Sequence, residues 1–232
     1  MKRNILWPTL VLLVFVFTPT ISAQQSTENK WESDIQQFEK SDKKNPTPRG
    51  AVLFVGSSSI RMWNSLAEDF PGIKVVNRGF GGSEIADSTF YVDRIVTPYL
   101  PSMIVFYAGD NDLSNGKTPQ QVLDDYKAFV SRVRIKLPTT EIAFISIKPS
   151  PARASIIDQM RQANALIRSY SSHDKNLLFI DVFTPMLGKD GNPRPELFGP
   201  DKLHMNRQGY DLWKSVLAPY LSPITPLKIS SH

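Results

Sequence analysis

Residues 52–63, VLFVGSSSIRMW, join a short apolar run to three consecutive serines. The run has no polar residue before Gly56, which is typical of a strand buried on both faces. Glycine followed by Ser57, Ser58 and Ser59 indicates a tight turn leading into a helix. A serine hydroxyl is a poor nucleophile until a base takes its proton, so any chemistry at this turn depends on what the rest of the chain supplies.

Similar apolar runs recur along the chain and predict five strands, at residues 51–56, 74–79, 102–109, 141–148 and 177–183. Segments with helical periodicity alternate with them, most clearly residues 118–137, 153–173 and 206–221. Parallel strands need helical crossovers, so this alternation predicts an α/β fold, a three-layer α/β/α sandwich with a five-stranded parallel sheet. We expect the strand order 2-1-3-4-5, which places a crevice beside the carboxyl end of the first strand, where the serines lie.

Length and composition fit one compact domain, with 232 residues of which 41% are hydrophobic. The absence of cysteine excludes a thiol nucleophile, a cysteine zinc site and a lipidated cysteine anchor. The chain has 27 basic and 22 acidic residues, and 25 basic residues remain if the first residues, with Lys2 and Arg3, are cleaved as a signal peptide. These charges are scattered in mixed-sign positions, whereas nucleic-acid binding favours a basic stripe, so no nucleic-acid partner is expected.

The first residues have the pattern of a secretory signal peptide. Lys2 and Arg3 precede an apolar segment at residues 5–17, and small residues end at Ala23, which predicts a signal peptide over residues 1–23 and a periplasmic or extracellular protein. The apolar segment is short for a membrane span, and none is expected after cleavage. We expect a linker and short helix at 24–48, with Trp31, Ile35 and Phe38 at helical spacing, the main domain at 49–222 and a tail at 223–232.

Four segments at predicted strand or loop ends carry the polar residues of interest: VGSSSIRMW, NRGFGGSEIAD, YAGDNDLSNG and DKLHMNRQGY, beginning at residues 55, 77, 107 and 201. Together and in this order they resemble the four blocks of the SGNH, or GDSL-type, hydrolase superfamily, over about residues 50–221. The resemblance implies the flavodoxin-like fold of that superfamily. It also implies one site built from a serine, a glycine, an asparagine and an Asp-x-x-His pair.

By this resemblance the nucleophile is Ser58. Gly56, Ser57 and Ser58 align with Gly-Asp-Ser, so this chain has serine where many members have aspartate. The backbone amide of Ser58 would lie at a helix N-terminus, where negative charge that develops during a reaction of the hydroxyl is favoured. The residues alone do not separate Ser58 from Ser57 or Ser59.

The predicted base is His204. Asp201 lies three positions earlier, where its carboxylate can reach Nδ1, fix the tautomer and leave Nε2 free for the serine. The alternative is that His204 merely packs beside the last helix, for which Asn206 is a candidate N-cap. Of the other histidines, His173 is expected to be solvated at a helix end, and His232 is the last residue. Asp181, at the end of the fifth strand, is the alternative to Asp201 as the orienting acid, but we expect it to order a loop.

The resemblance also implies three donors for an oxyanion: the amides of Ser58 and Gly82 and the side-chain amide of Asn111. A turn leading into a helix is a compatible reading of the glycines. Asp110 and Asp112 flank Asn111, but D-x-D is common in loops and hard cations need several converging oxygens. We expect no metal and no cofactor.

The sequence therefore predicts a secreted or periplasmic serine esterase acting on carboxylic esters or thioesters. The substrate is a small-molecule, lipid or glycan ester, and lysophospholipase-like, short-chain acyl esterase and polysaccharide O-deacetylase activities all stay open. Two other classes are a non-catalytic carbohydrate- or lipid-binding module on the same fold and a flavodoxin-like nucleotide-binding domain. No Gly-x-Gly-x-x-Gly follows the first strand, which disfavours the last of these. The oligomeric state is left open.

Overall fold

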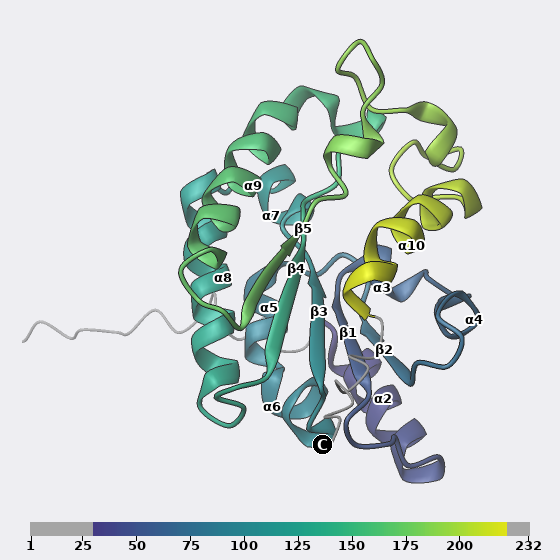
Figure 1. Ribbon diagram of the computed structural model, residues 1–232, viewed down its shortest axis with the longest axis vertical. Coiled ribbons are helices and arrows are strands. Elements are labelled where there is room, and N and C mark those ends of the chain that lie inside the picture. Colours follow the sequence, from purple (N-terminus) through teal and green to yellow (C-terminus); the bar gives the residue numbers. More distant parts are fainter. Residues whose placement is uncertain (1–29, 222–232) are drawn as a thin grey trace, which may run out of the picture.

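Five parallel strands form the central sheet of the computed structural model, which describes residues 30–221 (Figure 1). The spatial order is β2-β1-β3-β4-β5, so the predicted order is confirmed. The strands are β1 (Val52–Gly56), β2 (Val75–Gly79), β3 (Met103–Tyr107), β4 (Glu141–Ile145) and β5 (Leu177–Ile180).

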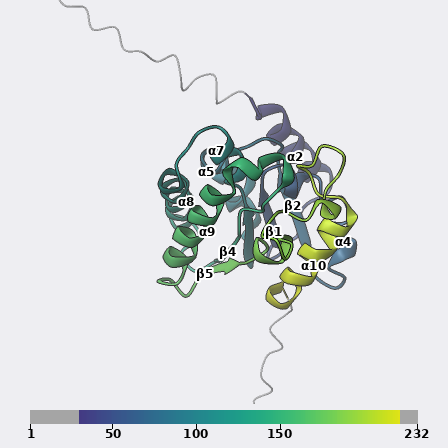
Figure 2. The same cartoon turned by 90° about the horizontal axis from the view of Figure 1, so that it is seen from above.

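Helices cover both faces of the sheet, which confirms the three-layer α/β/α architecture (Figures 1 and 2). One face packs against α2 (Glu32–Lys44), α5 (Ile85–Phe90), α6 (Val92–Ile95), α8 (Pro119–Arg134) and α9 (Ile157–Ser171). The other face packs against α3 (Ser58–Arg61), α4 (Leu66–Asp69) and α10 (Arg207–Leu221). Shorter elements complete the chain: α7 (Asp110–Ser114) and the 3₁₀ turns η1 (Thr97–Tyr99), η2 (Pro151–Ile156), η3 (Thr184–Met186) and η4 (Pro195–Leu197).

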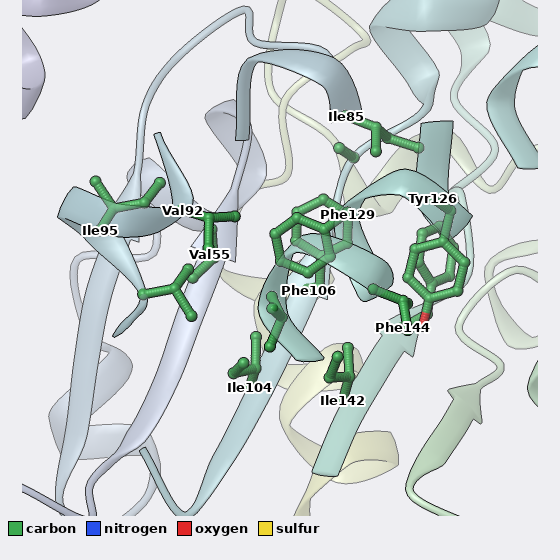
Figure 3. Close-up of a cluster of buried hydrophobic side chains, with 14 of the residues drawn as sticks. Val55, Ile85, Val92, Ile95, Ile104, Phe106, Tyr126, Phe129, Ile142 and Phe144 are labelled. Atoms are coloured by element: carbon green, nitrogen blue, oxygen red, sulfur yellow. The ribbon is translucent and has the colours of Figure 1, made fainter. Parts of the chain in front are cut away.

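The strand residues divide between two apolar cores, because successive side chains of a strand point to opposite faces. Leu53 and Val55 of β1 belong to the core under α8 and α9, whereas Val52 and Phe54 belong to the core under α10. Figure 3 shows the first core, where Phe106 of β3 stacks on Phe129 of α8 with ring centroids 4.1 Å apart. Burial on both faces explains why the strands are continuous apolar runs.

Strands β3, β4 and β5 end two or three residues earlier than their apolar runs predicted. For β4 and β5, side chains take over the hydrogen bonding of the backbone beyond the ladder. After β4, the amide and carbonyl of Ile147 bond to the side chain of Asn164 at 2.7 and 3.0 Å. After β5, the amides of Val182 and Phe183 both donate to Ser146 Oγ at 2.9 Å.

Two predicted helices also have different bounds. The N-terminal helix continues past Phe38 to Lys44, and Trp31 anchors it through a 2.9 Å hydrogen bond from Nε1 to the carbonyl of Gly81. The segment predicted as helical from residue 153 begins with the 3₁₀ turn η2, and regular α-helix starts only at Ile157. Within residues 30–221, no helix is long and apolar enough to cross a membrane. The predicted signal peptide and the tail after Ser222 lie outside the described residues.

Candidate active site

Ser58 lies at the carboxyl end of β1, where the chain turns sharply into α3. Gly56 makes this turn with φ of 141°, and a Cβ there would lie 1.8 Å from the carbonyl oxygen of Tyr107 on β3. Only glycine fits so close to a neighbouring backbone at that φ. The side chains of Ser57 and Ser59 are buried, and Ser58 alone of the three serines is partly exposed. The structure therefore separates the three hydroxyl groups, which the sequence did not.

His204 and Asp201 share one loop before α10. Asp201 Oδ1 accepts hydrogen bonds from the amides of Leu203 and His204, both at 2.9 Å, and Oδ2 lies 2.6 Å from His204 Nδ1. These donors lower the pKa of Asp201 to about 2, with the His204 hydrogen bond contributing most. Asn206 caps α10 by accepting from the amide of Gly209 at 3.2 Å, as predicted.

The two distant segments meet at the carboxyl edge of the sheet. His204 Nε2 lies 3.0 Å from Ser58 Oγ, although the two residues are 146 positions apart in the sequence. Since the Asp201 carboxylate only accepts hydrogen bonds, it holds the proton of a neutral imidazole on Nδ1 and leaves Nε2 as an acceptor for the hydroxyl. Asp201, His204 and Ser58 therefore form a hydrogen-bonded chain, arranged as the acid, base and nucleophile of a catalytic triad are.

The other side of the site carries hydrogen-bond donors. Gly82 has φ of 75° in the loop after β2, and Asn111 lies in α7 after β3. One hydrogen of Asn111 Nδ2 is donated to the carbonyl of Ser83 at 2.9 Å, and a second remains for another acceptor. A cavity of about 580 Å³ joins both sides and is lined by Ser58, Arg61, Met62, Asn64, Gly81, Gly82, Asp110, Asn111, Leu203 and His204.

The two aspartates beside Asn111 have separate partners. Asp110 pairs with Lys148 Nζ at 3.1 Å and with Arg153 Nη1 at 2.8 Å. Burial alone raises the pKa of Asp110, but these two positive charges hold it below its ordinary value. Asp112 is fully buried and pairs with Lys117 at 3.1 Å, and burial raises its pKa to about 6. In the part of the chain that the structure describes, no three His, Asp or Glu residues are grouped to hold a metal ion.

Two further sequence expectations concern residues away from the cavity. Asp181 Oδ1 accepts from the amide of Thr184 at 3.0 Å, and its Oδ2 accepts from Thr184 Oγ1 and Arg168 at 2.8 Å, so it orders a loop as predicted. His173 is exposed beyond the end of α9, also as predicted. His232 lies outside the described residues.

The sequence reasoning missed one close neighbour of the site, Arg153. Its Nη2 donates to Asn111 Oδ1 at 2.8 Å. Arg153 follows the two prolines of the PSPAR segment (residues 149–153), which indicate a loop and no particular function. No local pattern links this loop to a residue 42 positions earlier in the chain.

Comparison with known proteins agrees with this architecture. Residues 51–212 match the GDSL-like lipase/acylhydrolase family. The match covers well over half of the chain, so the protein belongs to this family, and the resemblance predicted from the four segments is confirmed. No curated protein matched the sequence.

Solved structures share the fold at low sequence identity. A Streptococcus pneumoniae protein provisionally described as a platelet activating factor superposes with a TM-score of 0.73 and 22% identity, covering 86% of this chain and 98% of that one. A GDSL-like lipase of Bacteroides thetaiotaomicron superposes with a TM-score of 0.69 and 18% identity, covering 82% of this chain and 97% of that one. A Bacteroides fragilis protein provisionally described as an acylhydrolase superposes with a TM-score of 0.72 and 18% identity, covering 82% of this chain and 96% of that one. The family and the fold together support a hydrolase.

Proposed function

We propose that this protein is a serine hydrolase that cleaves carboxylic esters or thioesters at the Ser58 cavity. The observation that carries the proposal is the hydrogen-bonded order of Ser58 Oγ, His204 and Asp201, at 3.0 and 2.6 Å. A non-catalytic binding module has no need of a base aimed at its only accessible serine in the turn. The family supports the same class of reaction.

In the proposed mechanism, His204 Nε2 takes the proton from Ser58 Oγ as the oxygen attacks the acyl carbonyl. The negative charge that develops on the carbonyl oxygen is stabilised by the amides of Ser58 and Gly82 and by the free hydrogen of Asn111 Nδ2. His204 then gives its proton to the leaving oxygen or sulfur, and the acyl group stays on Ser58. Water attacks the acyl-enzyme by the same path, releases the acid and restores the serine.

The lining of the cavity favours a short acyl group. Among the described residues that line it, Met62 and Leu203 are the only large apolar side chains, and Arg61, Asn64 and Asp110 are polar or charged. A long acyl chain would have little apolar surface to cover it, so binding would gain little from each added methylene. Among the open activities, a short-chain acyl esterase or a polysaccharide O-deacetylase therefore fits better than a lysophospholipase.

Residues 1–23 support the proposal that this enzyme acts in the periplasm or outside the cell. An exported enzyme meets ester groups of lipids, cell-wall glycans and external polysaccharides. N-terminal sequencing of the protein recovered from the periplasm or medium of an expressing cell tests this, with Gln24 as the expected first residue. Recovery of the intact chain from the cytoplasm alone would contradict it.

The catalytic proposal is tested by turnover of p-nitrophenyl acetate by the protein and by Ser58→Ala, Ser57→Ala and Ser59→Ala. We expect Ser58→Ala alone to lose turnover and labelling by a fluorophosphonate. Equal turnover by wild type and Ser58→Ala would refute the assignment. The Ser57 and Ser59 variants are matched controls, because each removes one hydroxyl from the same turn.

A further inference from the structure

Asn111 is held from both ends of its side-chain amide. Its Nδ2 donates to the carbonyl of Ser83 at 2.9 Å, and its Oδ1 accepts from Arg153 Nη2 at 2.8 Å. A guanidinium carries only donors, so it can face the amide oxygen but not the amide nitrogen. The contact with Arg153 therefore selects the amide orientation in which Nδ2 is on the side of Ser83 and the glycine loop.

Arg153 also belongs to a buried ion cluster with Asp110 and Lys148. Arg153 Nη1 and Lys148 Nζ lie 2.8 and 3.1 Å from the same oxygen of Asp110. The side chains of Lys148 and Asp110 are only 2% and 4% exposed, and that of Arg153 is 15% exposed. Two nitrogens of one planar guanidinium thus reach a carboxylate and an amide at once, which the single nitrogen of a lysine cannot do.

The cluster also has an excess of positive charge, two cations against one carboxylate. Asp110 of this cluster and Asn111 both line the cavity, and Arg153 contacts the oxygen end of the Asn111 amide. Arg153 does not line the cavity. It contacts the candidate oxyanion donor and not the space in which a substrate would bind.

The backbone beside Arg153 reaches the other half of the site. The amide of Ala152 donates to the carbonyl of Lys202 at 3.1 Å, and Lys202 lies between Asp201 and His204. Arg153 departs from helical backbone angles within η2, with φ of −121° and ψ of 26°. The η2 turn therefore contacts the Asn111 side by a side chain and the Asp201–His204 loop by its backbone.

We infer that Arg153 is a positioning residue, which holds the Asn111 amide with its nitrogen toward the oxyanion. The inference rests on the proposed function and adds to it a residue that acts through Asn111. The alternative is that Arg153 only neutralises buried Asp110. The two readings differ in whether the effect of changing Arg153 depends on Asn111.

The test is a double-mutant cycle with Arg153→Lys and Asn111→Ala, measured as kcat and KM on p-nitrophenyl acetate. Arg153→Lys keeps a positive charge for Asp110 but gives up one of its two contacts. We expect it to lower kcat about tenfold with KM little changed, less than the roughly 10²- to 10³-fold loss from removing an oxyanion donor outright. In the Asn111→Ala background the same substitution is expected to have no further effect.

Two outcomes would overturn the inference: an unchanged kcat for Arg153→Lys, or a loss of the same size with and without Asn111. Arg168→Lys is the matched control, because Arg168 also pairs with a carboxylate, Asp181, but lies away from the cavity. If Arg153→Lys fails to fold, Arg153→Met enters the same cycle, since Lys148 still compensates Asp110. Turnover that survives Ser58→Ala would instead overturn the proposed function, so the two failures are distinguishable.

Discussion

Replacing Asp201 by asparagine is expected to damage catalysis more than replacing it by alanine. In the structure, two backbone amides donate to Asp201 Oδ1 and His204 Nδ1 donates to Oδ2. An asparagine has a single acceptor oxygen, and the two amides retain it. Its NH₂ group then faces His204 Nδ1, which can accept this bond only when the imidazole proton has moved to Nε2. The Nε2 atom, now protonated, cannot take the proton of Ser58.

The magnitudes follow from the contacts. A hydrogen bond to a charged group contributes about 1.5–3 kcal/mol, or about 10- to 150-fold in rate. The Asp201 side chain is 52% exposed, so water replaces part of the lost bond in Asp201→Ala, and we expect about a tenfold loss of kcat. In Asp201→Asn the imidazole must also return to the tautomer with its proton on Nδ1, where that proton faces the NH₂ group of asparagine. Two donors that face each other cost about 2–3 kcal/mol, so we expect about a 10³-fold loss of kcat.

The assay is kcat for p-nitrophenyl acetate at neutral pH, with thermal melting of each variant to show that it is folded. Asp190→Asn is the matched control, because Asp190 contacts Asn192 in an exposed turn away from the cavity. An Asp201→Asn variant that is as active as Asp201→Ala would refute the reasoning about the orientation of the amide. Equal and complete loss in both would show that the carboxylate charge, and not the tautomer, dominates.

Three further results are expected. Gly56→Ala places a Cβ 1.8 Å from the Tyr107 carbonyl and should lower the free energy of unfolding in urea by about 3 kcal/mol or more, or prevent folding; wild-type stability would contradict the turn geometry. Turnover of p-nitrophenyl acetate should exceed that of the octanoate at least about tenfold in kcat/KM, because few apolar side chains line the cavity; an octanoate preference would contradict this. Burial alone raises the pKa of Asp69, but hydrogen bonds from Arg207, Trp63 and Ser65 lower it below the unfolded value of about 3.9. The ionised Asp69 therefore stabilises the folded protein above about pH 3.9, and this contribution is lost as the pH falls below that value. Asp69→Asn should therefore lower the free energy of unfolding at pH 7 by about 2 kcal/mol, a value kept small because Arg207 is half exposed. It should also reduce the loss of stability at acid pH in urea titrations; an unchanged loss would contradict the assignment.

Several elements of the fold could be predicted because their signals are local. The apolar runs mark the strands, and the helical periodicity of residues 118–137 places the start of α8 within one residue and its end within three. Strand ends and η2 were less predictable. The backbone beyond β4 and β5 bonds to the side chains of Asn164 and Ser146, which lie far away in the sequence. The η2 turn has a backbone kink at Arg153, and no local sequence pattern predicts it.

The sequence by itself determined the α/β class and the four segments that could carry a site, because periodicity and turn residues are properties of short stretches of the chain. The strand order was an expectation, and the tertiary structure decided it. Only the tertiary structure decided which serine of the turn is accessible, since that depends on how β1, β3 and α3 pack around Gly56. It also brought Ser58 to 3.0 Å from His204 and set Arg153 against Asn111. These contacts join residues 146 and 42 positions apart, and their geometry arises from the packing of the whole sheet and its helices.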